Sequence, residues 1–388
     1  MFSSVKRIHL GIGTVVKVGD EARLLGGSKA LLITDPIVVK VGLVDKVLAS
    51  LQDAGISYEV WDKVEPEPSF DVAESVKEKL IGNDFNVVIG VGGGSSLDTA
   101  KAAAVFAREP GTIKSFIGKP IPKRMLPLIL IPTTAGTGAE VSNLVVLSSQ
   151  DEEFKYAVYG FSFYPDVVIE DANMTATMPR QVTANTGLDA LCHAIEAYVS
   201  LEASPITDLF AVEAIRLINK HLRKAYVNGK DIDARYGMIK AALFAGLAFG
   251  NAGTVLGHAV GYAHAHVHHF PHGKTVAITM PYVLGYNAPA NVRKHVKIAN
   301  LLGEPVKDIP AKEASLKAAV AFKKLLEDLD MPTNLKVTGV KKEAIPDLAE
   351  RVFKSPKHVA RNPRKPTIED MIKLFENAYE GILSDGYA

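Results

Sequence analysis

The sequence has one cysteine and almost no net charge, and each of these scarcities excludes a class of protein. Cys192 is the single cysteine, so the chain cannot form an internal disulfide bond and a reducing compartment is expected. The formal net charge is +1 over 388 residues, which leaves no overall electrostatic field to attract nucleic acid or an anionic membrane. We therefore expect neither nucleic acid nor a membrane as a partner.

The N-terminal segment lacks an uninterrupted apolar run and a cleavage-site pattern, which argues against secretion. Residues 241–273 contain no Lys, Arg, Asp or Glu, and this segment is long enough to cross a membrane. However, the segment holds six of the eleven histidines and several glycines, which would make a poor lipid-facing surface. We interpret it as a helix buried in a protein core and expect a cytoplasmic protein.

The first half of the chain alternates short apolar runs with amphipathic stretches. This alternation predicts a parallel, doubly wound sheet with helices between the strands. The predicted strands are residues 30–35, 57–62, 86–94, 126–134 and 167–171, the predicted helices are residues 38–54, 70–81 and 95–107, and residues 143–149 and 156–160 are expected to form a hairpin.

Helical patterns dominate after about Pro179, and few β-branched runs remain there. The predicted helices are residues 182–201, 205–227, 234–251, 311–329, 343–353 and 367–379. A chain of 388 residues is also too long for one ordinary hydrophobic core. The sequence thus predicts an α/β domain over residues 1–180 and an all-helical domain over residues 181–388.

A glycine-rich turn, GVGGGSSLD over residues 90–98, stands where a predicted strand meets a predicted helix. Its three consecutive glycines have no Cβ atoms, so the backbone can approach a ligand closely. The N–H groups at the start of the helix near Ser95 would then face an anion such as a pyrophosphate. A simple turn with Ser95 as the helix cap explains the same letters, so the motif alone leaves both interpretations open.

Two further features favour a dinucleotide at this turn. Asp35 ends the strand 30–35, where a carboxylate can bind the adenosine ribose and repel a 2′-phosphate, which favours NAD over NADP. A turn aspartate before Pro36 is the alternative. The loop of residues 131–142 carries three threonines at the edge of the sheet where ligands of open α/β folds bind, although a plain surface loop is also compatible with it.

One carboxylate and three imidazoles are candidate metal ligands. Asp189 and His193 are four residues apart, so one face of a helix presents both side chains. With His258 and His272 they make an oxygen and nitrogen set that suits Fe²⁺ or Zn²⁺. A capping aspartate and scattered core histidines are the alternative. Residues 264–269 (HAHVHH) could also hold a metal or line a polar cleft, so spacing alone does not identify the ligands.

These segments resemble the motifs of the iron-containing (group III) alcohol dehydrogenase family. The resemblance rests on GGGSSLDTAK, IPTTAGTGAEVS, GLDALCHAIEAYVS, GHAVGYAHAHVHHFPHG and NPRKPTIEDMI, in the family's order and over nearly the whole chain. It implies a dehydroquinate synthase-like architecture, in which an α/β dinucleotide-binding domain precedes an all-α metal-binding domain. It also implies a metal-dependent, NAD-linked dehydrogenase of small primary alcohols or diols that forms a homodimer or a larger homo-oligomer.

The resemblance implies a role for each site residue. The metal, Fe²⁺ or Zn²⁺, would be held by Asp189, His193, His258 and His272. NAD would have its pyrophosphate on Gly93, Gly94 and Ser95 with Asp98 nearby, its ribose on Asp35, and the rest of the cofactor lined by Thr133, Thr134, Thr137 and Lys155.

The sequence departs from the family pattern at Tyr262, where many members have a second histidine that has been viewed as a proton relay. The hydroxyl of Tyr262 is therefore the candidate relay. The implied reaction passes a hydride from a metal-bound alkoxide to nicotinamide C4. The alternatives are a polyol, hydroxyacid or maleylacetate-type oxidoreductase, a dehydroquinate synthase-like lyase, and a metal-binding protein without enzymatic activity. The lyase would need basic residues for its anionic substrate, and residues 241–273 have no Lys or Arg.

Overall fold

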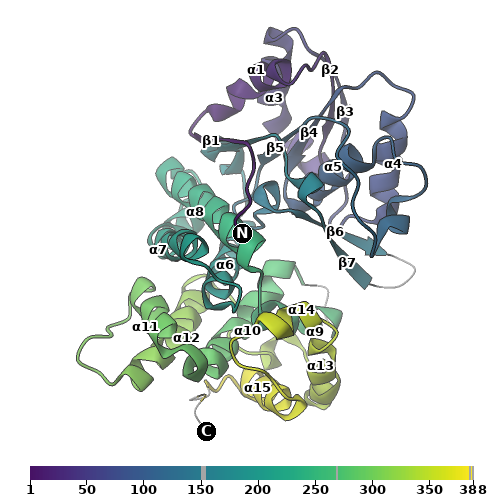
Figure 1. Ribbon diagram of the computed structural model, residues 1–388. Coiled ribbons are helices and arrows are strands. Elements are labelled where there is room, and N and C mark those ends of the chain that lie inside the picture. Colours follow the sequence, from purple (N-terminus) through teal and green to yellow (C-terminus); the bar gives the residue numbers. More distant parts are fainter. Residues whose placement is uncertain (150–153, 268–269, 384–385, 387–388) are drawn as a thin grey trace. The chain divides into compact units, whose positions relative to one another are not determined.

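The computed structural model describes residues 1–149, 154–267, 270–383 and 386, without the side chains of residues 154–155 and 266–267. The chain divides into two compact units, which are Ser3–Met178 and the pair Met1–Phe2 with Pro179–Ala388 (Figure 1). A parallel sheet with helices forms the first unit, and the second is helical. This arrangement confirms the predicted fold class.

The sheet of the first unit has six parallel strands in the order β1-β8-β5-β4-β2-β3. Strands β8, β5 and β4 are buried over their whole length, as expected where helices cover both faces of a parallel sheet. The strands are β1 (Arg7–Gly11), β2 (Lys29–Ile33), β3 (Ser57–Trp61), β4 (Val87–Gly92), β5 (Leu128–Pro132) and β8 (Val167–Asp171).

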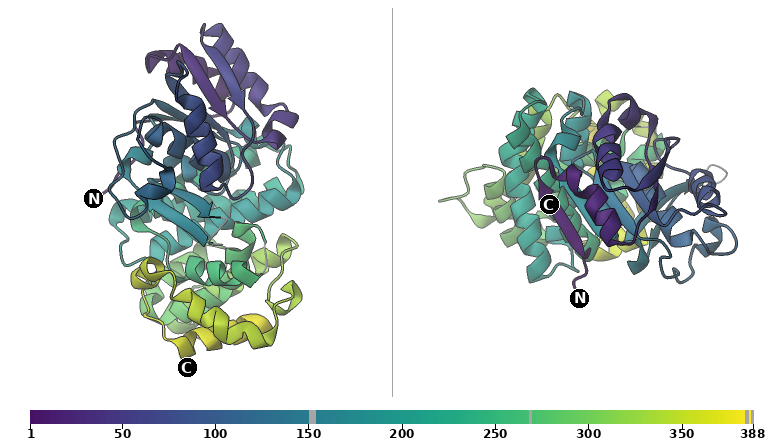
Figure 2. Two further views of the ribbon diagram at one scale, coloured as in Figure 1. Left: turned by 90° about the vertical axis from the view of Figure 1, so that its right-hand side faces the viewer. Right: turned by 90° about the horizontal axis from the view of Figure 1, so that it is seen from above.

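Alternate residues of each strand face two separate hydrophobic clusters, because successive side chains of a strand point to opposite faces. Ala30 and Leu32 of β2 belong to the cluster that includes α1 and α3, and Leu31 and Ile33 belong to the cluster that includes α4 and α5. Figure 2 shows these helices around the sheet from two further directions. The helices are α1 (Val18–Leu24), α2 (Pro36–Lys40), α3 (Leu43–Asp53), α4 (Phe70–Leu80) and α5 (Gly94–Phe106).

The structure differs from the sequence predictions at two places in this unit. The predicted helix over residues 38–54 is two helices, α2 and α3, because Gly42 between them has a positive φ of 73° that interrupts the helical backbone. The structure also contains β1, a five-residue edge strand that pairs with β8 and was not predicted. No residue of β1 is fully buried, so its sequence has no continuous apolar run to mark it.

The predicted hairpin is present as β6 (Leu144–Ser149) and β7 (Phe154–Tyr159), which form a separate antiparallel pair. Val145 and Leu147 of β6 pack with Val105 and Phe106 of α5 in one hydrophobic cluster. The hairpin is therefore anchored on the helix that follows the glycine-rich turn.

The helical unit is organised around α6, which packs against α7, α8 and α10. Most of its residues are buried, as expected for a helix that is apolar on every side. The six predicted helices are present within two residues at each end. The helices are α6 (Arg180–Val199), α7 (Pro205–Val227), α8 (Ile232–Ala252), α9 (Leu256–Val267), α10 (His272–Asn287), α11 (Val292–Leu301), α12 (Ala311–Asp328), α13 (Ile345–Val352), α14 (Pro356–Arg361) and α15 (Ile368–Glu380).

The sequence predicted that the uncharged segment 241–273 is a helix buried in a protein core, but the segment does not form one continuous helix. It breaks at Gly253, where φ is 71°, and continues as α9 and the start of α10. No single helix among the described residues has the length and apolar character of a membrane span. The pair formed by α8 and residues Leu256–Ala265 has the required length and apolar character when the two helices are joined, but the chain bends by 102° between them.

Asp166 joins three parts of the first unit just before β8. Its carboxylate accepts hydrogen bonds from Lys6 at 2.6 Å, from Arg124 at 2.5 Å and from the backbone N–H of Leu128 at 3.1 Å. Burial by itself would raise the pKa of Asp166, but the hydrogen bonds from Arg124 and Lys6 outweigh it and lower the pKa to about 2. The ionised carboxylate therefore stabilises the fold.

We expect Asp166→Asn to lower the free energy of unfolding by about 1–3 kcal/mol at pH 7, because Arg124 and Lys6 lose their charged acceptor. The pKa of Asp166 is depressed in the folded state, so the stabilisation is complete above the unfolded value of about 3.9 and disappears as the pH falls toward 2. Thermal unfolding of the wild type and of Asp166→Asn should show a difference in the free energy of unfolding at pH 3 that is about half the difference at pH 7. A gap of constant size would contradict this account.

Candidate functional site

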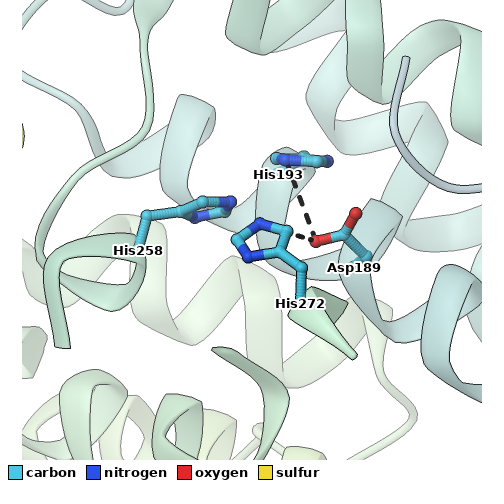
Figure 3. A group of neighbouring side chains, drawn as sticks. All are labelled: Asp189, His193, His258 and His272. Atoms are coloured by element: carbon cyan, nitrogen blue, oxygen red, sulfur yellow. Dashed lines mark ion pairs between the residues drawn. The ribbon is translucent and has the colours of Figure 1, made fainter. Parts of the chain in front are cut away.

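Four predicted metal ligands of the helical unit meet at one place (Figure 3). Asp189 and His193 project from one face of α6, His258 lies in the first turn of α9, and His272 is the first residue of α10. Each side chain offers one ligand atom, and these four atoms all lie within 4.8 Å of one another. Three separate helices thus bring one carboxylate and three imidazoles together.

The distances inside this cluster suit ligands of a shared cation better than direct hydrogen bonds. Asp189 Oδ1 lies 3.9 Å from His193 Nε2 and 3.7 Å from His272 Nε2, as the dashed lines in Figure 3 mark. Both distances exceed the usual hydrogen-bond range. Four nitrogen and oxygen ligands around one tetrahedral metal ion stand roughly 3.4 Å apart, which is close to the spacing observed.

Two buried atoms of the cluster lack a hydrogen-bond partner among the described residues. They are Asp189 Oδ1 and His258 Nε2, on side chains that are about 3% and 2% exposed. Buried polar atoms are nearly always paired, so an orphaned carboxylate oxygen facing an orphaned ring nitrogen indicates a missing partner between them. A divalent cation is a partner that both atoms could bind, and the residues present therefore fit a metal ion.

The protonation of the cluster also suits metal binding. Burial raises the pKa of Asp189 to about 6, a shift that His272 opposes and Glu196 reinforces. Burial and the neighbouring His193 lower the pKa of His258 well below its ordinary value, so its ring is neutral at pH 7. A neutral imidazole can donate its lone pair to a metal, and a cation would favour the ionised form of Asp189.

The start of α10 reaches the cluster because Gly273 has no side chain. A Cβ atom at this position would stand 2.2 Å from the backbone oxygen of Asn185 and 2.9 Å from Cβ of Asp189. The backbone of α10 therefore lies directly against α6. His272, the preceding residue, is held beside Asp189 by this close packing.

Two residues around the cluster were missed by the sequence analysis. Glu196 hydrogen-bonds to Nδ1 of His258, and it follows Asp189 by seven residues, so the helical repeat that linked Asp189 to His193 could have identified it. His358 comes from α14, and its ring is parallel to that of His258 with centroids 6.4 Å apart. Nothing in the local sequence around His358 connects it with the other histidines.

Tyr262, the predicted proton relay, lies on the accessible side of the cluster. Its side chain is 36% exposed, its ring stacks on His272 with centroids 5.4 Å apart, and its centroid lies 5.6 Å from that of His358. Burial and the nearby His258 lower the pKa of His358 to about 4. An accessible phenol and a neutral imidazole therefore flank the cluster.

The predicted pyrophosphate turn in the first unit is built as a cradle. Gly92 has φ 151°, and a Cβ on Gly94 would stand 2.9 Å from Cγ2 of Thr137. Gly93 lies beside Thr134, and no side chain of the described residues caps the helix α5 that begins at Gly94. The first N–H groups of α5 thus lie beside the threonine loop without a side-chain cap, as an anion site at this turn would require.

Two predicted cofactor residues, Asp35 and Asp98, are carboxylates that are hydrogen-bonded within the first unit. Asp35 caps α2 through Oδ1 and accepts a hydrogen bond from Ser96 through Oδ2, so it lies at the glycine turn and also serves as the turn aspartate. Asp98 is buried, and its carboxylate accepts from the backbone N–H of Val146 and pairs with Lys101.

The last three predicted cofactor positions are Ser95, Thr133 and Lys155. Ser95 is half-buried in the first turn of α5, and Thr133 is buried with its backbone N–H bonded to Gly92. The side chain of Lys155 lies outside the described residues. Of the histidine-rich segment 264–269, His264 is fully buried, and the side chains of residues 266–269 lie outside the described part of the chain.

Comparison with known proteins gives matches along almost the whole chain. The family model for iron-containing alcohol dehydrogenase matches residues 5–172, and the model for the C-terminal part of the Fe-containing alcohol dehydrogenase family matches residues 183–379. Long-chain-alcohol dehydrogenase 1 of Geobacillus thermodenitrificans is 39% identical over 379 residues, which are 97% of this chain and 95% of that protein.

Solved structures are similar over the same length. The structure of a 1,3-propanediol oxidoreductase has a TM-score of 0.92 at 35% identity and covers 98% of this chain and 100% of its own. Sulfoacetaldehyde reductase from Bifidobacterium kashiwanohense, solved in complex with NAD⁺, has a TM-score of 0.89 at 28% identity and covers 97% of this chain and 98% of its own.

We expect Gly273→Ala to weaken metal binding and lower the thermal unfolding temperature, because the added methyl group would push α10 away from Asn185 and Asp189. Overpacking of this kind costs about 1–3 kcal/mol. Metal content after dialysis and the unfolding temperature of the metal-free protein check the two effects separately. A variant that equals the wild type in both would show that the close packing does not position His272.

Proposed function

The chain belongs to the iron-containing alcohol dehydrogenase family, and from this premise we propose that it interconverts small primary alcohols or diols and their aldehydes with NAD and one divalent metal ion. The matches confirm the predicted family and the predicted enzyme class, an NAD-linked alcohol dehydrogenase. The observation that carries the proposal is the convergence of Asp189, His193, His258 and His272.

We assign the metal to this cluster, as either Fe²⁺ or Zn²⁺. When bound, the metal ion supplies positive charge that favours the deprotonated form of an alcohol and polarises an aldehyde carbonyl. The orphaned atoms Asp189 Oδ1 and His258 Nε2 support this assignment. Three nitrogens and one oxygen suit either metal, and a substrate oxygen would bind as a fifth ligand.

We assign NAD to the glycine turn of the first unit. Gly93, Gly94 and Ser95 would hold the pyrophosphate at the start of α5, with Thr134 and Thr137 beside it. The remaining proposed contacts are Asp35, Asp98, Thr133 and Lys155. The carboxylate of Asp35 beside the turn supports NAD over NADP, because it would repel a 2′-phosphate. The similar sulfoacetaldehyde reductase was solved with NAD⁺, in agreement with this choice.

The chain's own residues would position the substrate and control its proton. The proposed role of Tyr262 is to pass the alcohol proton from the cluster to solvent, and its exposure beside His272 supports this role. The buried apolar surroundings of Asp189 and His193 would limit water at the reacting carbon.

The substrate proposal follows what the relatives share. Their names include a long-chain alcohol, 1,3-propanediol and sulfoacetaldehyde, so the common feature is an alcohol or aldehyde group and the rest of the molecule varies. A series of short primary alcohols, diols and aldehydes, assayed with NAD and NADP under anaerobic Fe²⁺ or Zn²⁺, would identify the preferred substrate.

We further propose that the chain forms a homodimer or a larger homo-oligomer in the cytoplasm. One edge of β1 has no neighbouring strand among the described residues, and such an edge favours association. The single, buried cysteine supports a reducing compartment. Light scattering of the purified protein measures the first part of this proposal.

We expect His272→Ala to lose both the bound metal and NAD-dependent turnover, because the site would lose one of its four ligand atoms. Metal content and the rate of NADH formation from a primary alcohol measure the two losses. His221→Ala is a control from the same unit that lies outside the cluster, and it should retain both. Full activity of a metal-free His272→Ala protein would refute the proposed site.

We expect Tyr262→Phe to reduce kcat by roughly 10- to 100-fold while metal content stays unchanged, because the variant keeps the ring beside His272 and loses only the hydroxyl. Tyr226→Phe is the matched control, since it removes a hydroxyl that bonds to Asp330 away from the cluster. Equal kcat values for wild type and Tyr262→Phe would exclude the hydroxyl as the relay.

A further inference from the structure

Glu196 makes contacts with His258 that go beyond ordinary packing. Its Oε1 accepts hydrogen bonds from the backbone N–H groups of Val255 at 2.9 Å and of His258 at 3.0 Å. Its Oε2 forms a further hydrogen bond with Nδ1 of the His258 ring. The residue is 1% exposed, so these contacts take place away from solvent.

The contact at Oε2 determines which ring nitrogen of His258 is free. Oε1 already accepts from two backbone N–H groups, and in the ionised form of Glu196 Oε2 can only accept as well, so Nδ1 of His258 then carries the proton of this hydrogen bond. In a neutral imidazole the lone pair then resides on Nε2. This is the atom of His258 that has no hydrogen-bond partner among the described residues and belongs to the cluster with Asp189.

We propose that Glu196 is the positioning residue of the metal centre, where it fixes both the tautomer and the orientation of His258. This inference rests on the proposed function, since it requires His258 to be a metal ligand. Ligating histidines commonly donate their second ring N–H to a carboxylate, which fixes the ring and makes it a better ligand. Glu196 serves His258 in this way without contributing an atom to the cluster.

The position of Glu196 in α6 explains how one helix arranges most of the centre. Asp189, His193 and Glu196 follow at intervals of four and three residues, so they lie along one face of α6. The first two are ligands, and the third holds a ligand of another helix. Because Glu196 also accepts two N–H groups near the start of α9, the backbone and the ring of His258 are oriented by the same carboxylate.

Gly257 leaves the space that this contact needs. A Cβ at Gly257 would stand 2.9 Å from Oε1 of Glu196 and 2.5 Å from the end of the Met280 side chain. The first turn of α9 can therefore close over the carboxylate. A role in capping α9 alone would explain the contacts of Oε1, but it would not require Oε2 to face the ring of His258.

The test uses Glu196→Gln in the full-length protein, stripped of metal and reloaded with Co²⁺ or Zn²⁺. The amide oxygen can keep the two backbone hydrogen bonds of Oε1, while the amide NH₂ that replaces Oε2 can only donate to Nδ1 of His258. The ring would then carry its proton on Nε2, where it blocks the metal. We expect the metal dissociation constant, measured by chelator competition, to rise about 10- to 100-fold, and the visible spectrum of bound Co²⁺ to change.

Two control variants separate positioning from general stability. Asp231→Ala removes the cap of α8, which bonds to Ala234 and does not touch His258, and it should lower the unfolding temperature but leave the metal dissociation constant unchanged. Glu196→Gln should show the opposite pattern, with metal-free unfolding close to that of the wild type. Wild-type metal affinity in Glu196→Gln would overturn the inference, as would an equal loss of affinity in Asp231→Ala.

His258→Ala distinguishes a failure of this inference from a failure of the proposed function. If His258→Ala binds metal like the wild type, the metal site itself is wrongly assigned. If His258→Ala loses affinity and Glu196→Gln does not, the site stands and only the role of Glu196 is wrong. Adding Glu196→Gln to His258→Ala should cause no further loss of affinity, because the ring that Glu196 orients is already gone.

Discussion

The helical unit depends on one electrostatic constraint, which is the burial of an ionisable carboxylate among imidazoles. Asp189 is almost inaccessible, and a charge in such a place is costly unless a partner compensates it. His272 and His193 cannot fill this role by direct hydrogen bonds to Oδ1, since their Nε2 atoms lie 3.7 Å and 3.9 Å from it. A shared cation resolves the constraint, and the close approach of α10 to α6 and the orientation of His258 by Glu196 both serve it.

Much of the fold could be predicted because its elements are marked locally. The start of α7, for example, is marked by Ser204 and Pro205, where a capping box and a proline define the first turn. The prediction failed where a single backbone conformation decided the outcome. Gly42 and Gly253 both adopt positive φ and break helices that hydrophobic patterning alone would continue. The edge strand β1 was missed because its half-buried residues have no apolar run.

The candidate site could be predicted only in part. The pair Asp189 and His193 is visible from helical spacing, but spacing could not select His258 and His272 from a segment with six histidines, and the family resemblance was needed for that choice. Glu196 was within reach of the same helical repeat. His358 was not, because its place beside His258 arises from the packing of a distant helix, which no local pattern records. Asp35 illustrates a different limit, since the side chain that caps α2 through Oδ1 also reaches the glycine turn through the hydrogen bond that Oδ2 accepts from Ser96.

Anomalous X-ray diffraction from crystals grown with Zn²⁺ tests most directly whether side chains from α6, α9 and α10 hold one divalent ion. The account predicts one strong anomalous peak per chain, about 2.0–2.2 Å from a carboxylate oxygen of Asp189 and from one ring nitrogen each of His193, His258 and His272. A metal peak bound elsewhere, for example by the histidines of residues 264–269, with none between these four side chains would contradict it.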